Sequence, residues 1–226
     1  MPTLRRHNRK RRNGHHMSVA TVHKRPRPPE FEPGTVPPDF IPAPDLANWA
    51  MASFVVDGAP LENPDHQHLR DAIIGCLWAT IPNSRHMVQV VGQAERSQFQ
   101  GGKWIKARQE QQMRDWFGEL PDFILTFDAG YASVCDDGSF CALVEHELAH
   151  CGQALDKFGG PKFTRDGQPV YVLKGHDVEE FVCIVRRYGA GRGAGKTLDL
   201  VQAAMQRPSV TAAAITGACG TCRTKF

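Results

Sequence analysis

The pattern of apolar and polar positions along the chain predicts short helices mixed with short strands. Helical spacing of apolar residues predicts helices over residues 46–54, 64–80, 104–116, 139–157, 177–188 and 198–205. Apolar or β-branched runs predict strands over residues 88–91 and 122–127, and Asp166-Gly167 predicts a hairpin over residues 163–173. We therefore expect an α+β domain.

Proline is concentrated before the first of these predicted elements. Eight of the 16 prolines lie between residues 26 and 44, where they disfavour helices and sheet ladders alike. We expect residues 1–44 to form a disordered, basic and proline-rich arm and linker, residues 45–205 to fold, and residues 206–226 to form a tail.

The 226-residue chain has a formal net charge of +3 that is unevenly distributed. Residues 1–29 contain nine Lys or Arg and no Asp or Glu, so residues 30–226 carry a net charge of −6. A basic arm on an acidic body suggests an anionic polymer as partner, most often nucleic acid, although a merely disordered tail explains the same charge. The candidate nucleic-acid contacts are Arg5, Arg6, Arg9, Lys10, Arg11 and Arg12.

Composition excludes several classes of protein. No apolar run approaches the roughly 18–20 residues of a membrane span, so we expect a soluble protein. The basic start is not followed by an apolar segment, which argues against a signal peptide. The seven cysteines are odd in number and lack framework spacing, which argues against a secreted disulfide scaffold. The expected compartment is the cytoplasm.

Residues 146–150 contain the strongest chemical signal in the sequence. His146 and His150 are four positions apart, so on a helix they lie on one face with Cβ atoms about 5–6 Å apart. Two imidazoles at this spacing can share one tetrahedral zinc, and Glu147 can reach a water at the metal. The alternative is an amphipathic helix with two surface histidines, which leaves Glu147 between apolar neighbours without a reason.

A catalytic zinc needs a third protein ligand and one open position. His176 is the candidate, 26 residues after His150, because a hairpin between two helices returns the chain to the site. Asp177 or Glu180 could accept the other ring N–H of His176 and fix its tautomer. Glu179 or Glu180 is the alternative third ligand. By contrast, His66 and His68 near a predicted helix start are expected at the surface.

These segments, His146-Glu147-x-x-His150 and Gly175-His176-x-x-Glu179-Glu180-Phe181, resemble those of the SprT-like zinc metallopeptidases. The closer resemblance is to metallopeptidases encoded by bacteriophages and prophages, and it covers about residues 88–189. It implies a zincin-like fold, one catalytic Zn²⁺ bound by the three histidines, and an endopeptidase with Glu147 as general base. It also implies a protein or peptide substrate, DNA-associated if the likeness to SprT extends to biology, and a bacterial host cytoplasm.

The implied reaction is hydrolysis of a peptide bond. Zinc lowers the pKa of water towards about 7 and polarises the scissile carbonyl, while Glu147 accepts the water proton and passes it to the leaving amine. The strand at residues 123–127 is a candidate edge on which an extended substrate adds by main-chain hydrogen bonds, and an ordinary core strand is the alternative.

Other signals leave a second reading open. The zinc ribbon of several SprT-like proteins is absent here or reduced to Cys219-x-x-Cys222, which supplies two of the four ligands of a structural zinc. The Gly-rich segment 190–197 resembles a phosphate-binding loop, but only 29 residues follow it, too few for a nucleotide hydrolase. The alternative function is a nucleic-acid-binding accessory protein with a structural zinc and no protease activity.

Overall fold

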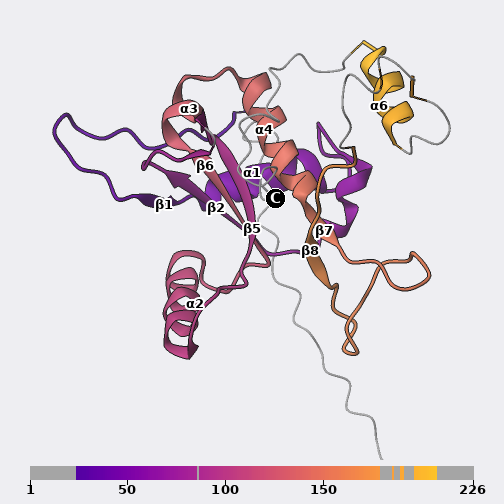
Figure 1. The fold of residues 1–226 in the computed structure, drawn as a ribbon. Coiled ribbons are helices and arrows are strands. Elements are labelled where there is room, and N and C mark those ends of the chain that lie inside the picture. The colour runs from indigo at the N-terminus through magenta and orange to yellow at the C-terminus, as the bar shows by residue number, and fades with distance from the viewer. Residues whose placement is uncertain (1–23, 86, 179–184, 186–188, 191–195, 208–226) are drawn as a thin grey trace, which may run out of the picture.

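The computed structural model describes residues 24–85, 87–178, 185, 189–190 and 196–207 (Figure 1). Four strands form a mixed sheet in the order β1-β2-β6-β5. β2 and β6 are parallel, whereas β1 pairs with β2 and β5 pairs with β6 in antiparallel register. The bounds are β1 Phe40–Pro42, β2 Ile74–Ala79, β5 Gly92–Arg96 and β6 Phe123–Asp128. The expected α+β class is confirmed at this level.

Helices and two small ribbons complete the described fold. The helices are α1 Pro44–Ala50, which continues as a π-helical turn η2 over Met51–Val55, the 3₁₀ helix η3 Pro64–Leu69, α2 Lys103–Phe117, α3 Ala129–Val134, α4 Asp137–His150 and α6 Thr197–Ala204. The ribbons pair β3 Ser84–Arg85 with β4 Val88–Gln89, and β7 Cys151–Gln153 with β8 Tyr171–Leu173. No helix in these described parts is both long and apolar enough to cross a bilayer.

The two faces of the four-stranded sheet are covered differently. On one face, α1 and α4 bury an aromatic core in which Phe140 of α4 contacts the rings of Trp78 and Phe127. On the other face, α2 packs Met113 against Leu77 and Ile124 and extends away from the sheet (Figure 1). Within the described residues, the second face is therefore only partly covered by a helix.

The helix predicted over residues 64–80 is wrong beyond its first turns. Asn63 caps η3 as expected, since its side chain accepts a hydrogen bond from the backbone N–H of Asp65. The chain then enters β2, the strand between β1 and β6. A continuous apolar run is typical of a strand buried on both faces, and pairing on both edges outweighed the helical spacing. The predictions over 104–116, 122–127 and 198–205 match α2, β6 and α6 closely.

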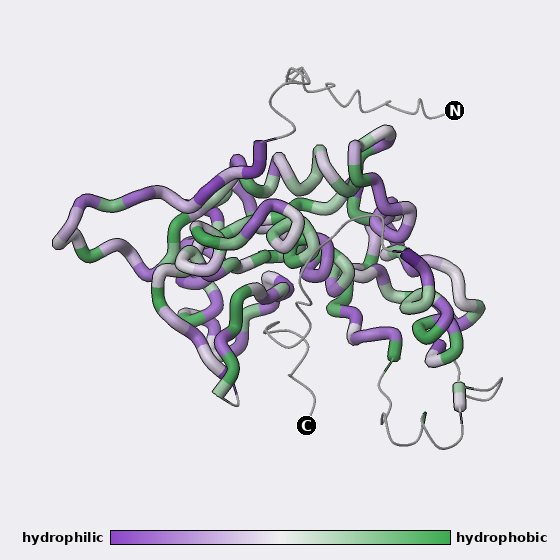
Figure 2. Tube along the Cα trace, turned by 90° about the horizontal axis from the view of Figure 1, so that it is seen from above, coloured by the Kyte–Doolittle hydropathy of each residue, from purple (hydrophilic) through white to green (hydrophobic). Residues whose placement is uncertain are grey.

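Part of the expected N-terminal linker is packed on the domain. Arg25 is only 3% exposed and donates to the backbone carbonyls of Ala132 and Cys135. Its guanidinium pairs with Asp137 and lies 4.4 Å from the centre of the Phe140 ring, a cation–π distance. The hydrophilic start of the described chain (Figure 2) is held at α3 and α4 through these contacts. Two cations of the basic stretch, Arg25 and Arg27, therefore bind the fold itself.

Candidate metal centre

Helix α4 begins at a strong cap. The side chain of Asp136 accepts the backbone N–H of Ser139 and also its hydroxyl proton, which fixes the first turn. Its buried positions include Phe140, Leu143, Val144 and Leu148, so the helix crosses the core face of the sheet. The helix ends at His150, not at residue 157 as predicted.

Tertiary hydrogen bonds account for this early end. The carbonyl of His150 accepts from the backbone N–H of Lys174, and the carbonyl of Cys151 accepts from Nε2–H of His68 at 2.6 Å. Both carbonyls thus accept hydrogen bonds from residues outside the helix, and residues 151–153 pair as β7 with β8. The second histidine of the motif therefore lies at the corner between α4 and β7.

The ring of His150 has a fixed tautomer. Its Nδ1 lies 2.7 Å from the carbonyl oxygen of Lys174, and a carbonyl can only accept. Nδ1 therefore carries the proton, and Nε2 of the neutral ring presents its lone pair. The same Lys174 backbone binds the ring and the main chain of His150, which holds the ligand nitrogen in one place.

Three imidazoles converge at this corner. One nitrogen each of His146, His150 and His176 lie within 4.8 Å of one another. The Nε2 atoms of His146 and His150 are 3.3 Å apart. Two nitrogens bound at about 2.0–2.1 Å to one tetrahedral zinc lie roughly 3.3–3.4 Å apart, so this pair fits one such ion. The donor set therefore suits a borderline-soft divalent metal.

The β7–β8 ribbon brings His176 to the other two histidines. Residues 154–170 extend the ribbon through further hydrogen bonds, and a turn with Gly167 at φ +74° reverses the chain. The expected turn at Asp166-Gly167 is present. The strand that pairs with β8 is β7, however, and not a strand within the predicted hairpin of residues 163–173. The ribbon thus returns the chain to the end of α4, as the spacing predicted.

Glu147 is fully buried on the side of α4 that faces β5. A Cβ atom added to Gly92 of β5 would lie 2.7 Å from Cδ1 of Leu143 and 2.9 Å from Oε1 of Glu147. Only glycine permits this close approach of the strand to the helix. The burial contradicts the reading of α4 as a helix with surface histidines, since His150 is also only 3% exposed.

The other candidate site residues have different positions. Asp177 pairs with Lys196 and Lys174 instead of orienting a ring. Its hydrogen bond from Lys196 holds the pKa of this carboxyl below its ordinary value. Glu179 and Glu180, the arm residues 5–12, and Cys219 and Cys222 lie outside the described residues.

Lys174 was not predicted from the sequence, because this residue acts through its backbone. The positions of two histidines were predicted wrongly. His66 is 1% exposed, and burial lowers its pKa to about 4. His68 holds the Cys151 carbonyl and is half-buried. Both lie in η3, which packs against the end of α4, so the expectation that they are surface residues was wrong. The Asn63-Pro64 cap predicted the start of η3, but it did not predict that η3 would pack against α4.

Of the two interpretations of residues 123–127, a substrate-binding edge or an ordinary core strand, the structure supports the core strand. β6 lies inside the sheet, between β2 and β5, because it pairs with both. Among the described strands of this sheet, β5 follows β6 at the end of the order, and it lies against α4. A hollow of about 90 Å³ lies at the three histidines, lined also by Ala149 and residues 174, 175 and 177.

Comparison with known proteins gives one match. No curated protein and no solved structure matches the chain significantly. The sequence model of one family, described as "Putative phage metallopeptidase", matches residues 47–206, more than two thirds of the chain. The matched region contains three strands of the sheet, β2, β6 and β5, together with α4 and all three histidines. The chain belongs to the putative phage metallopeptidase family.

Proposed function

We propose that this protein is a zinc-dependent endopeptidase with a zincin-like fold. In this proposal His146, His150 and His176 bind the metal, and Glu147 is the general base. The observation that carries it is the convergence of three imidazole nitrogens, two of them 3.3 Å apart, in a chain whose family is named for metallopeptidases.

The donor set supports a catalytic ion over a purely structural one. Three neutral imidazoles leave one position of a tetrahedral ion open, whereas structural zinc sites are usually closed by four protein ligands. A bound zinc would polarise the scissile carbonyl and acidify a water molecule. The hollow at the three histidines provides room for these reacting atoms.

The position of Glu147 supports its proposed role as general base. It follows the first histidine, so its side chain leaves α4 about 100° round the helix, on the β5 side of the site. Its carboxylate takes the proton of the attacking water and passes it to the leaving amide nitrogen. Burial of a carboxylate is costly in a helix that only supports the core, so a functional role accounts for its placement.

Metal removal tests this function. We expect dialysis against a chelator to abolish casein cleavage, and about one equivalent of zinc per chain to restore it. His176→Ala should bind zinc at least tenfold more weakly, whereas His23→Ala, outside the described residues, should bind it normally. Cleavage that survives complete metal removal, or a zinc-loaded protein that cleaves no unfolded protein, contradicts the proposal.

A nucleic-acid role for the arm is a second proposal, supported by the +9 charge of residues 1–29. Arg25 and Arg27 bind the domain, so only the six cations at positions 5–12 should be replaced, by glutamine. For single-stranded DNA, we expect the slope of log affinity against log salt to become shallower by up to about 4, since each phosphate contact contributes about 0.7. Unchanged affinity and slope at matched salt would refute a DNA contact by the arm.

A further inference from the structure

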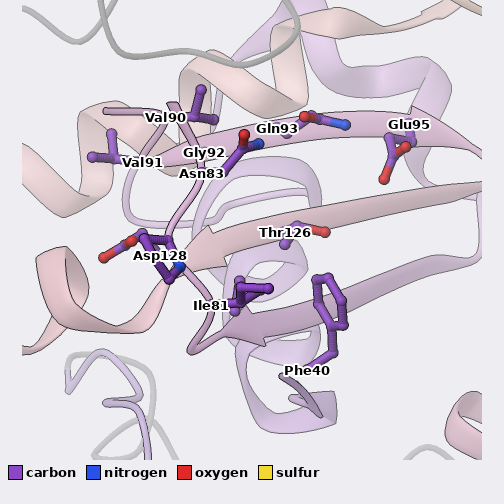
Figure 3. A pocket seen from close by; sticks show the side chains of 12 residues that line it. Phe40, Ile81, Asn83, Val90, Val91, Gly92, Gln93, Glu95, Thr126 and Asp128 are labelled. Carbon is purple, nitrogen blue, oxygen red and sulfur yellow. The ribbon is translucent and has the colours of Figure 1, made fainter. Parts of the chain in front are cut away.

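The partly covered face of the sheet contains a groove of about 400 Å³. It lies over β1, β2, β6 and β5, and residues 81–83 and 90–91 line one side (Figure 3). α2 packs elsewhere on this face, against Leu77 and Ile124. We call this space the sheet groove and describe it by the six side chains Phe40, Ile81, Val90, Gln93, Glu95 and Thr126.

The sheet groove combines apolar walls with a polar strip. Phe40 and Ile81 remain 41% and 45% exposed, although both are large hydrophobic side chains. Gln93 lies directly opposite Thr126 in the β5–β6 register, and Glu95 follows two positions along the same face of β5. Figure 3 shows Gln93 and Glu95 on one side of the groove and Phe40 on the other. Such walls fit a ligand with an aliphatic stem and a polar end.

The acidic side chains that line the groove indicate that the polar end of the ligand is a cation. Glu95 and Asp128 line the groove, and no Lys or Arg does so among the described residues. Asp128 already caps α3 and accepts from Gln89. Glu95 is exposed to solvent, accepts a hydrogen bond from Gln93, and forms no ion pair with any cation in the described part of the chain. A cation in the groove can therefore reach its carboxylate.

Strand β5 connects the groove with the candidate metal centre. Gln93 and Glu95 face the groove, whereas Gly92 approaches Glu147 on the opposite face. In the proposal that follows, a polypeptide crosses the edge of the sheet at β5, with one side chain in the groove and a nearby peptide bond at the three histidines.

We propose that the sheet groove binds a lysine or arginine side chain of the polypeptide substrate, with the aliphatic stem on Phe40 and Ile81 and the cation at Glu95. This inference rests on the proposed peptidase function and names its substrate class, proteins with a basic residue near the cleaved bond.

Direct binding tests the proposal independently of cleavage. The zinc-loaded full chain with Glu147→Gln is titrated calorimetrically with Ac-Ala-Thr-Xaa-Val-Thr-NH₂, where Xaa is lysine or norleucine. Norleucine keeps the stem and lacks the charge. We expect the lysine peptide to bind about tenfold more tightly, as one charge-assisted contact predicts.

Two variants locate the interaction. Adding Glu95→Gln should remove the preference for lysine, and Ile81→Ala should weaken both peptides. Glu119→Gln, an exposed carboxylate after α2, is the matched control and should retain the preference. Unfolding midpoints verify that all variants are folded.

Equal binding of both peptides, no binding of either at millimolar concentration, or a lysine preference that survives Glu95→Gln would overturn the proposal. Casein cleavage without lysine-selective binding would refute the groove and leave the peptidase function intact. Lysine-selective binding without any cleavage would refute the peptidase function, and with it the description of the bound chain as a substrate, but not the binding of a basic side chain in the groove.

Discussion

Replacing Glu147 with glutamine is expected to lower kcat for casein cleavage by about 10²- to 10⁴-fold while zinc content stays near one per chain. Glutamine has nearly the same shape, so the packing against Gly92 and Leu143 is retained. It cannot accept and return a proton at neutral pH, so only the proposed proton transfer is lost. The measurements are steady-state kinetics and metal analysis on the same preparation.

Glu145 provides the matched control for this substitution. It lies two residues away on α4, and its carboxylate accepts a hydrogen bond from the side-chain amide of Asn63, the N-cap residue of η3. Glu145→Gln should change kcat by less than about threefold, since the residue takes no part in the proposed proton transfer. Equal losses in the two variants would mean that helix charge, not a base at position 147, controls the rate.

Gly92→Ala is expected to reduce kcat by about tenfold or more without loss of zinc. The added methyl group would lie 2.7 Å from Leu143 and 2.9 Å from the Glu147 carboxylate, so at least one of these side chains must move. Leu143 and Glu147 are both fully buried, so neither can move without disturbing its neighbours, and any shift of Glu147 moves the proposed base. A misplaced base slows proton transfer, and the overpacking should also cost about 1–3 kcal/mol of unfolding free energy.

Gly102→Ala controls for the general effect of replacing a glycine. A Cβ atom at position 102 meets no atom within 4 Å, and the backbone there needs no left-handed conformation. Its kcat should therefore equal that of the unmodified protein. If Gly92→Ala also leaves kcat unchanged, the close contact between β5 and Glu147 has no catalytic importance.

Patterns that act within one element were predictable from the sequence. The polar and apolar spacing of α2 predicted its bounds to within one residue at each end, and the apolar run of β6 did the same. The i, i+4 spacing placed His146 and His150 on one helix face, and the structure brings them together with His176. These features depend on residues that are close in sequence.

Features that depend on distant residues were not predictable. The apolar spacing of residues 74–79 predicts a helix, and only the pairing of these residues with β1 and β6 makes them the strand β2. The end of α4 at His150 depends on the Lys174 and His68 contacts, and neither residue has a distinctive sequence signature. The importance of Gly92 likewise appears only when β5 is placed against α4.

The buried Arg25 has a consequence for the order in which the protein folds during synthesis. Its ion-pair partner, Asp137, is 112 residues further along the chain. At about 5–20 residues per second, the ribosome needs roughly 6–20 s to add those residues, so the N-terminal segment cannot dock before then. The segment that contains Arg25 and Arg27 therefore takes its final position late, and these two cations stay accessible to chaperones or nucleic acids throughout that interval.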